Sequence, residues 1–177
     1  MTWKEKLRRQ ACVLWWRVKY GKKDKSFNLS SAGIHPHHLL LILPPTFEYF
    51  DVARLMIEPL ITHMRPRFIT VLVPENFRTW ISTDLGARVA VYDPRKKNFL
   101  GFPELDLRRK VGELEPDVAV DLMPEFSPYT AALAAASLAP LRISLARTQE
   151  PGFFNVFIEY AGEKDLNERY ETLLKYV

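Results

Sequence analysis

The sequence is poor in cysteine and in long apolar runs. Its single cysteine, Cys12, cannot form a disulfide within the chain, which favours a reducing compartment. No apolar run reaches the roughly 18–20 residues that a membrane-spanning helix needs. The N-terminal stretch ACVLWW is short and no small-residue cleavage site follows it, so it does not resemble a secretory signal. We therefore expect a cytoplasmic protein.

Glycine-rich phosphate-binding turns are also missing. The first predicted strand is followed by Pro44-Pro45-Thr46, and proline has no N–H group to donate to a phosphate. A P-loop lysine motif, a nucleophile elbow and a paired-cysteine motif are absent from the sequence as well. We therefore predict no bound cofactor. A stand-alone nucleotide-dependent enzyme is an alternative function, but this turn argues against it.

Histidines cluster at one point of the chain, where His35, His37 and His38 surround a proline. A zinc site would need further Cys, Asp or Glu ligands at a suitable spacing, and the segment offers none. Solvated or strand-edge histidines are the better interpretation. We predict no metal site.

Positive charge is concentrated at the N-terminus. Residues 1–26 hold nine Lys and Arg residues and two acidic residues, a net charge of +7, whereas the rest of the chain has a net charge of −3. We therefore divide the chain into a basic helical arm (1–26), a connector (27–37) and a folded domain (38–177). The mildly acidic domain makes nucleic acid an unlikely partner.

The arm has the periodicity of an amphipathic helix. Its apolar residues recur every three or four positions, while Arg8 and Arg9 lie off that stripe. Three alternatives follow: packing on the protein's own sheet or on a second copy, peripheral contact with an anionic inner membrane, or nucleic-acid binding. The apolar stripe comprises Trp3, Leu7, Ala11, Leu14, Trp15 and Val18. The residues that we predict to contact a membrane or a partner are Trp3, Leu7, Trp15, Arg8 and Arg9.

Short apolar runs alternate with helical patterns through the folded domain. The clearest unit is residues 114–145, in which Ser127 suits the N-cap and Pro128 the first turn of an alanine-rich helix between two strands. Pro59 predicts a kink or a break in a helix over 46–64. Six strands are predicted, at 38–43, 68–73, 88–92, 118–122, 142–145 and 154–158. The pattern predicts an α/β fold: a single Rossmann-like, doubly wound, mainly parallel sheet with an extra N-terminal amphipathic helix.

Ligands of such sheets bind beyond the carboxyl ends of the strands. One carboxylate there could act as a general base. Each carboxylate also has a purely structural alternative. Asp51 would lie in the first turn of its helix, where the helix dipole stabilises a negative charge, and Asp121 would only accept hydrogen bonds from loop amides. The candidate binding residues at this edge are Thr46, Glu48, Glu75, Asp93, Asp121, Glu125 and Ser127.

Several stretches resemble the N-terminal half of the lipopolysaccharide heptosyltransferases, which use ADP-heptose. The resemblance covers residues 38–177. It rests on the order of ITVLVPENF, ARVAVYD and LEPDVAVDLMPEFSPYTAALAAASLAPLRISL, and on the terminal ERYETLLKYV. Family members have two facing Rossmann-like domains. The resemblance implies that this chain corresponds to the acceptor half, without the donor-binding C-terminal domain.

The resemblance also implies a function. Asp51-Val52 matches an Asp-Val pair whose aspartate is the proposed catalytic base of the family, although Phe50 stands where the family has glycine. We expect a heptosyl- or hexosyltransferase-like domain of cell-envelope glycan assembly. It would be non-catalytic alone or would act with a second copy or a separate donor-domain protein. The alternative is a binding or scaffold protein that dimerises or docks on a membrane through its N-terminal helix.

Overall fold

The computed structural model describes residues 35–82, 86–146, 152–158 and 165–177, together with Trp3, Gln10, Ala11, Val13 and Leu14. Four of the predicted contact residues of the arm lie outside this part of the chain: Leu7, Arg8, Arg9 and Trp15. Within the described residues, the longest apolar helices are too short or too polar to cross a bilayer.

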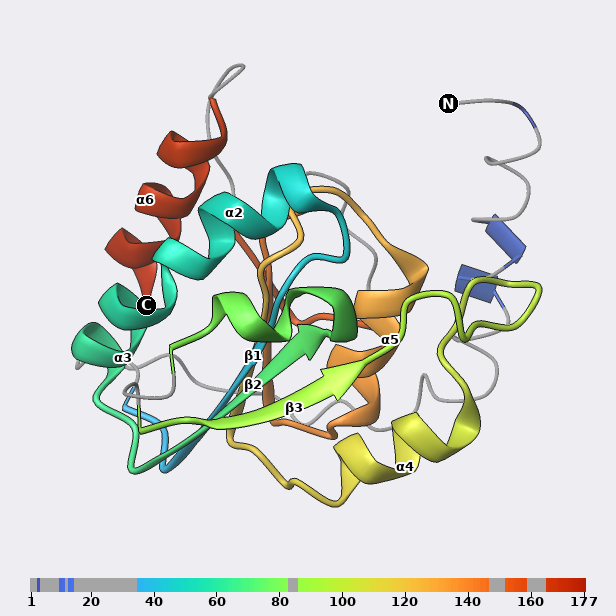
Figure 1. Ribbon diagram of the computed structural model, residues 1–177, viewed down its shortest axis with the longest axis horizontal. Coiled ribbons are helices and arrows are strands. Elements are labelled where there is room, and N and C mark those ends of the chain that lie inside the picture. The colour runs from blue at the N-terminus through green and yellow to red at the C-terminus, as the bar shows by residue number, and fades with distance from the viewer. Residues whose placement is uncertain are drawn as a thin grey trace.

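One parallel sheet of six strands forms the centre of the molecule (Figure 1), as predicted. The strand order is β3-β2-β1-β4-β5-β6, and every neighbouring pair is parallel. This order reverses between β1 and β4, as in a doubly wound Rossmann-like fold. The strands are β1 His38–Ile42, β2 Phe68–Pro74, β3 Arg88–Tyr92, β4 Val118–Asp121, β5 Leu141–Ser144 and β6 Val156–Phe157.

The central strands are apolar on both faces because helices cover both sides of the sheet. In β1, Leu39 and Leu41 point into one core, and Leu40 and Ile42 point into the other. The first core is covered by α2 Phe47–Leu55, α3 Ile57–Met64 and α6 Leu166–Tyr176, and the second by α4 Leu105–Gly112 and α5 Pro128–Ala136 (Figure 1). A short 3₁₀ helix, η1 Glu75–Trp80, follows β2.

The helix predicted over 46–64 is interrupted, as its proline indicates. The interruption lies three residues before that proline. The break is at Met56, between α2 and α3. Proline in a helix interior would leave the carbonyl group four residues earlier without its partner and would clash with it. The chain avoids both costs by starting α3 at Ile57, so that Pro59 lies in the first turn, where an N–H group has no helical partner.

The alanine-rich helix α5 is buried, as its composition predicts. Ser127 is its N-cap, and its hydroxyl group accepts a hydrogen bond from the Thr130 N–H group at 3.4 Å. The small side chains of α5 allow α4 to pack closely on it. A Cβ atom added at Gly112 would lie 3.1 Å from the Ala136 carbonyl oxygen, which leaves little room for a larger residue in α4.

The few described residues of the arm only partly follow the predicted stripe. Trp3 and Leu14 are 73% and 61% exposed, and Ala11 is exposed too. Val13, which is off the stripe, is buried in the core that contains α5. The arm therefore contacts the domain through a different position from the one that the periodicity indicates, and leaves stripe residues exposed.

Candidate functional site at the carboxyl edge

The strand order reverses between the loops that leave β1 and β4. The helix after β1 turns to one face of the sheet, and the helix after β4 turns to the other. Ligands of open α/β sheets bind at such a reversal and along the adjoining carboxyl ends. A cavity beside β3 contains two of the predicted site residues, and the others lie around the reversal or on α2.

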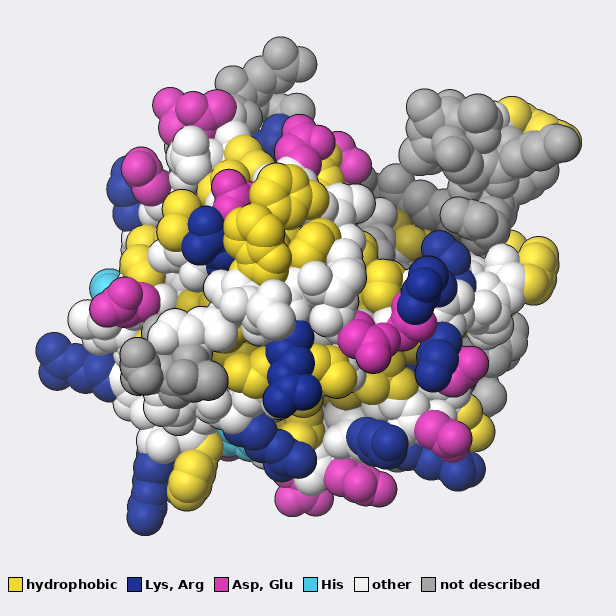
Figure 2. Space-filling view, in the orientation of Figure 1, with side chains coloured by type: hydrophobic (Ala, Val, Ile, Leu, Met, Phe, Trp, Pro, Cys, Tyr) yellow, Lys and Arg dark blue, Asp and Glu magenta, His cyan; other side chains and the backbone are white. Residues whose placement is uncertain are grey.

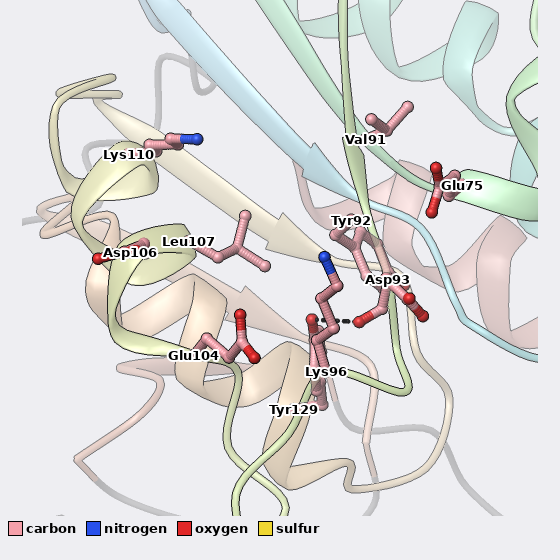
Figure 3. A pocket seen from close by; sticks show the side chains of 10 residues that line it. All are labelled: Glu75, Val91, Tyr92, Asp93, Lys96, Glu104, Asp106, Leu107, Lys110 and Tyr129. Atoms are coloured by element: carbon pink, nitrogen blue, oxygen red, sulfur yellow. Dashed lines mark hydrogen bonds between the residues drawn. The ribbon is translucent and has the colours of Figure 1, made fainter.

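A cavity of about 390 Å³ lies between the carboxyl end of β3 and helix α4 (Figure 3). It brings together two residues that the sequence predicts as ligand contacts, Glu75 after β2 and Asp93 after β3. The other lining residues come from β3, the loop after it, α4 and α5: Val91, Tyr92, Lys96, Glu104, Asp106, Leu107, Lys110 and Tyr129.

Some charged side chains of this cavity are held by other residues in the described ranges, and others make no such contact. Arg95 holds Asp93 through hydrogen bonds of 2.9 and 3.0 Å, and these lower the pKa of Asp93 to about 2. Lys96, Lys110 and Glu104 point into the space (Figure 3), whereas Asp106 turns away. Among the residues that the structure describes, Lys96, Lys110, Glu104 and Glu75 form no side-chain hydrogen bond or ion pair. Two cations and two anions are therefore free to contact a ligand.

Two stacked tyrosines form one wall of the cavity. The rings of Tyr92 and Tyr129 have centroids 5.4 Å apart and an interplanar angle of 29°. The Tyr129 hydroxyl group donates a hydrogen bond to the Asp93 carbonyl oxygen at 2.9 Å. The Tyr92 hydroxyl group donates one to the Leu43 carbonyl oxygen at 2.6 Å. Burial raises the pKa of both tyrosines, so both remain protonated donors at neutral pH.

Asp121 lies at the reversal between β1 and β4 and is only 2% exposed. Its carboxyl group accepts a hydrogen bond from the Met123 N–H group at 3.1 Å. Burial raises the pKa of Asp121 to about 7, although hydrogen bonds from Thr130 and Met123 oppose this rise. These contacts correspond to the structural alternative, in which Asp121 shapes the loop after β4.

The remaining predicted edge residues lie around the same reversal. Glu125 faces Tyr49 of α2, and burial together with a hydrogen bond to Glu125 raises the pKa of Tyr49. Thr46 is the N-cap of α2 without a side-chain capping bond, and Glu48 lies in the first turn of that helix. Ser127 is occupied as the cap of α5. The structure thus separates these residues from the cavity beside β3.

The predicted catalytic residue, Asp51, lies on the surface of α2 in an ion pair with Arg54. Its Oδ1 atom is 2.9 Å from Arg54 Nε and 2.8 Å from Arg54 Nη2. The Arg54 guanidinium group lies 5.7 Å from the ring centroid of Trp80, at the end of η1. Asp51 therefore lies beside exposed aromatic side chains at the Trp80 end of η1, whereas Glu75, at the other end, lines the cavity.

Sequence reasoning missed several residues of the cavity, above all Lys110 and Tyr129. A signal for Lys96 and Glu104 existed, because one is in the loop after β3 and the other immediately precedes α4. Tyr129 belongs to a helix that reads as uniformly apolar. Only the packing of α5 against the sheet shows that its hydroxyl group reaches the strand edge.

The geometry of the site has no parallel from which a function could be transferred. No three His, Cys, Asp or Glu side chains among the described residues are arranged to hold a metal ion. Comparison of the chain with protein-family models, with curated proteins and with solved structures gave no match in any of the three.

Proposed function

We propose that this domain binds a carbohydrate acceptor in the cavity between β3 and α4, as the acceptor half of a heptosyltransferase-like glycosyl transfer. The observation that carries the proposal is the set of four charged side chains, Lys96, Lys110, Glu75 and Glu104. They line one cavity at the carboxyl edge and make no ion pair within the described part of the chain.

The chemistry of the cavity fits a sugar. Each sugar hydroxyl group can donate one hydrogen bond and accept others, and it therefore suits a site that offers both ammonium donors and carboxylate acceptors. Hydrogen bonds to charged groups are the stronger ones. Val91 and Leu107, which line the same cavity, add apolar surface for the less polar face of the ring. The balanced charge of the four free side chains favours a neutral ligand.

The donor would come from another domain or chain. The turn Pro44-Pro45-Thr46 after β1 lacks the N–H groups and the glycines that cradle a nucleotide phosphate. The resemblance makes Asp51 the general base, with Arg54 fixing the orientation of its carboxylate. Asp51 does not line the cavity, so it could serve only an acceptor that extends from the cavity to α2. The resemblance to the heptosyltransferase acceptor half supports this assignment.

The test is a titration of ¹⁵N-labelled protein with glucose, mannose, galactose and N-acetylglucosamine, followed by NMR. We expect shifts of the amide signals of residues 93–96 and 104–110. Glu104→Gln and Lys110→Ala should each weaken binding several-fold. Glu104 makes no capping bond to α4, so its replacement should leave the helix intact. Lys175→Ala, at an exposed position of α6, is the matched control. Shifts that persist unchanged in both cavity variants would contradict the proposal.

A second candidate function is docking through the N-terminal helix, and the exposure of Trp3 and Leu14 favours it. Exposed apolar residues that cluster on one face are typical of interaction sites. Trp3→Glu with Leu14→Glu should lower the mass in solution or abolish binding to anionic liposomes. Because Val13 remains in place, its packing on the domain is unaffected. A monomer that never binds liposomes, in both proteins, would exclude this function.

A further inference from the structure

An aromatic platform, formed by Phe47 and Trp80, lies between α2 and η1 (Figure 2). The two side chains are 51% and 49% exposed, and their ring centroids are 5.5 Å apart at an interplanar angle of 71°. Phe77 supports them from below, with its centroid 6.0 Å from that of Phe47, and stacks on buried Phe50 at 4.5 Å. The platform therefore rests on the core and holds its orientation.

The rim of the platform is polar and electrically balanced. Arg54 lies over Trp80, and its charge is neutralised by the ion pair with Asp51. A charged ligand gains little from such a pair. A neutral ligand with hydroxyl groups can accept hydrogen bonds from the guanidinium group and donate them to the carboxylate. The rings themselves suit a flat, weakly polar face.

The size of the platform favours a small ligand over a protein. Two half-exposed aromatic side chains present about 200 Å² between them, since each such side chain has roughly 150–250 Å² to bury. A stable protein interface takes roughly 800 Å² from each partner. A pyranose ring, which has an apolar C–H face and a rim of hydroxyl groups, matches both the area and the chemistry.

A single element connects the platform with the cavity beside β3. Glu75, the first residue of η1, lines the cavity, and Trp80, its last residue, forms the platform. A 3₁₀ helix rises about 2.0 Å per residue, so the two ends are about 10 Å apart. One sugar ring cannot contact both ends, whereas a short chain of linked rings can.

We propose that Phe47 and Trp80 form a second sugar subsite, and that the ligand of this domain is therefore an oligosaccharide that runs along η1 from the cavity to the platform. This inference rests on the proposed function, because it extends the same carbohydrate site. It also places a sugar unit beside Asp51, the residue expected to act as the base.

The test compares monosaccharides with linear trisaccharides, by NMR titration with glucose and maltotriose, mannose and mannotriose, and N-acetylglucosamine and chitotriose. At least one trisaccharide should bind about tenfold more tightly than its monosaccharide. Trp80→Ala and Phe47→Ala should each remove that gain and leave monosaccharide affinity unchanged. Trp80→Phe should retain part of it. Tyr176→Ala, at an exposed aromatic residue on α6, is the control, and thermal unfolding of each variant verifies the fold.

Two failures are distinguishable. If a monosaccharide shifts the cavity amides but no trisaccharide binds more tightly, or if the gain survives in Trp80→Ala and Phe47→Ala, the second subsite is wrong and the proposed function stands. If no sugar of either length shifts the cavity amides, the proposed function fails, and the inference fails with it.

Discussion

The Tyr170 hydroxyl group, in the last helix, donates a hydrogen bond of 2.5 Å to the carbonyl oxygen of Leu122, immediately after β4. Both atoms are buried, and the bond joins residues 48 positions apart. Tyr92 makes the corresponding bond to Leu43, after β1. The loops on the two sides of the sheet reversal are thus each held by a tyrosine from a distant element.

Tyr170→Phe should lower the free energy of unfolding by about 1–3 kcal/mol, because the variant leaves the buried Leu122 carbonyl group without its partner. Urea denaturation followed by circular dichroism measures the change. Tyr176→Phe, in the same helix but 66% exposed, should have an effect close to zero. Equal effects of the two substitutions would show that the hydrogen bond does not hold the loop.

Asp121 should make stability depend on pH. Its pKa is about 7 in the folded protein against an ordinary value of 3.8, so the folded state holds an extra proton between these values. The free energy of unfolding should therefore fall as pH rises from about 4 to 7, by up to about 4 kcal/mol, and level off above that range. Asp121→Asn, which keeps an acceptor for Met123, should remove this decline. Urea denaturation across the pH range, with both proteins, gives the difference; parallel curves would contradict the prediction.

The N-caps of α6 and α2 should differ in strength. Asp165 accepts a hydrogen bond from the Glu168 N–H group at 2.8 Å, whereas Thr46 occupies the same position of α2 without such a bond. Asp165→Ala should cost about 1 kcal/mol of stability and Thr46→Ala a few tenths. Thermal or urea unfolding measures both. A larger loss from Thr46→Ala would show that Thr46 has a role beyond the one its geometry gives.

Leu133 tests the burial of α5. It is fully buried, so Leu133→Ala should destabilise the protein by about 2–5 kcal/mol, through lost burial and the cavity left behind. Leu138→Ala, just beyond the helix and largely exposed, should cost well under 1 kcal/mol. Urea denaturation of both variants measures the contrast. Similar losses would mean that α5 is not packed as described.

Much of the fold follows from local signals in the sequence. The apolar runs of β1, β2 and β4 and the cap at Ser127 are short-range patterns, and the structure confirms them. The break before Pro59 was predictable in kind and not in position, because the proline only requires that the helix restart within a turn of it. The burial of Val13 depends on tertiary contacts that no periodicity within the arm reveals.

The candidate site was only half predictable. The carboxyl edge, Glu75 and Asp93 follow from strand order alone. Lys110 faces the cavity because of the rotation of α4 about its axis, which is set by packing on α5. Trp80 was not predicted as a site residue; η1 ends there and leaves its ring half exposed. Side-chain direction at the end of a short element depends on neighbours distant in sequence.

The alanine side chains of α5 form a thin, buried helix layer on one face of the sheet. Alanine loses almost no side-chain freedom on burial, so this layer is ordered at a low entropic cost. These small side chains accompany a close approach of the Gly112 backbone to the Ala136 carbonyl oxygen, so that α4 lies directly against α5. Glu104 immediately precedes α4 and Lys110 belongs to it, and both line the cavity wall opposite β3. The position of this cavity wall therefore depends on the packing of α4 against α5, a helix that contributes Tyr129 to the lining.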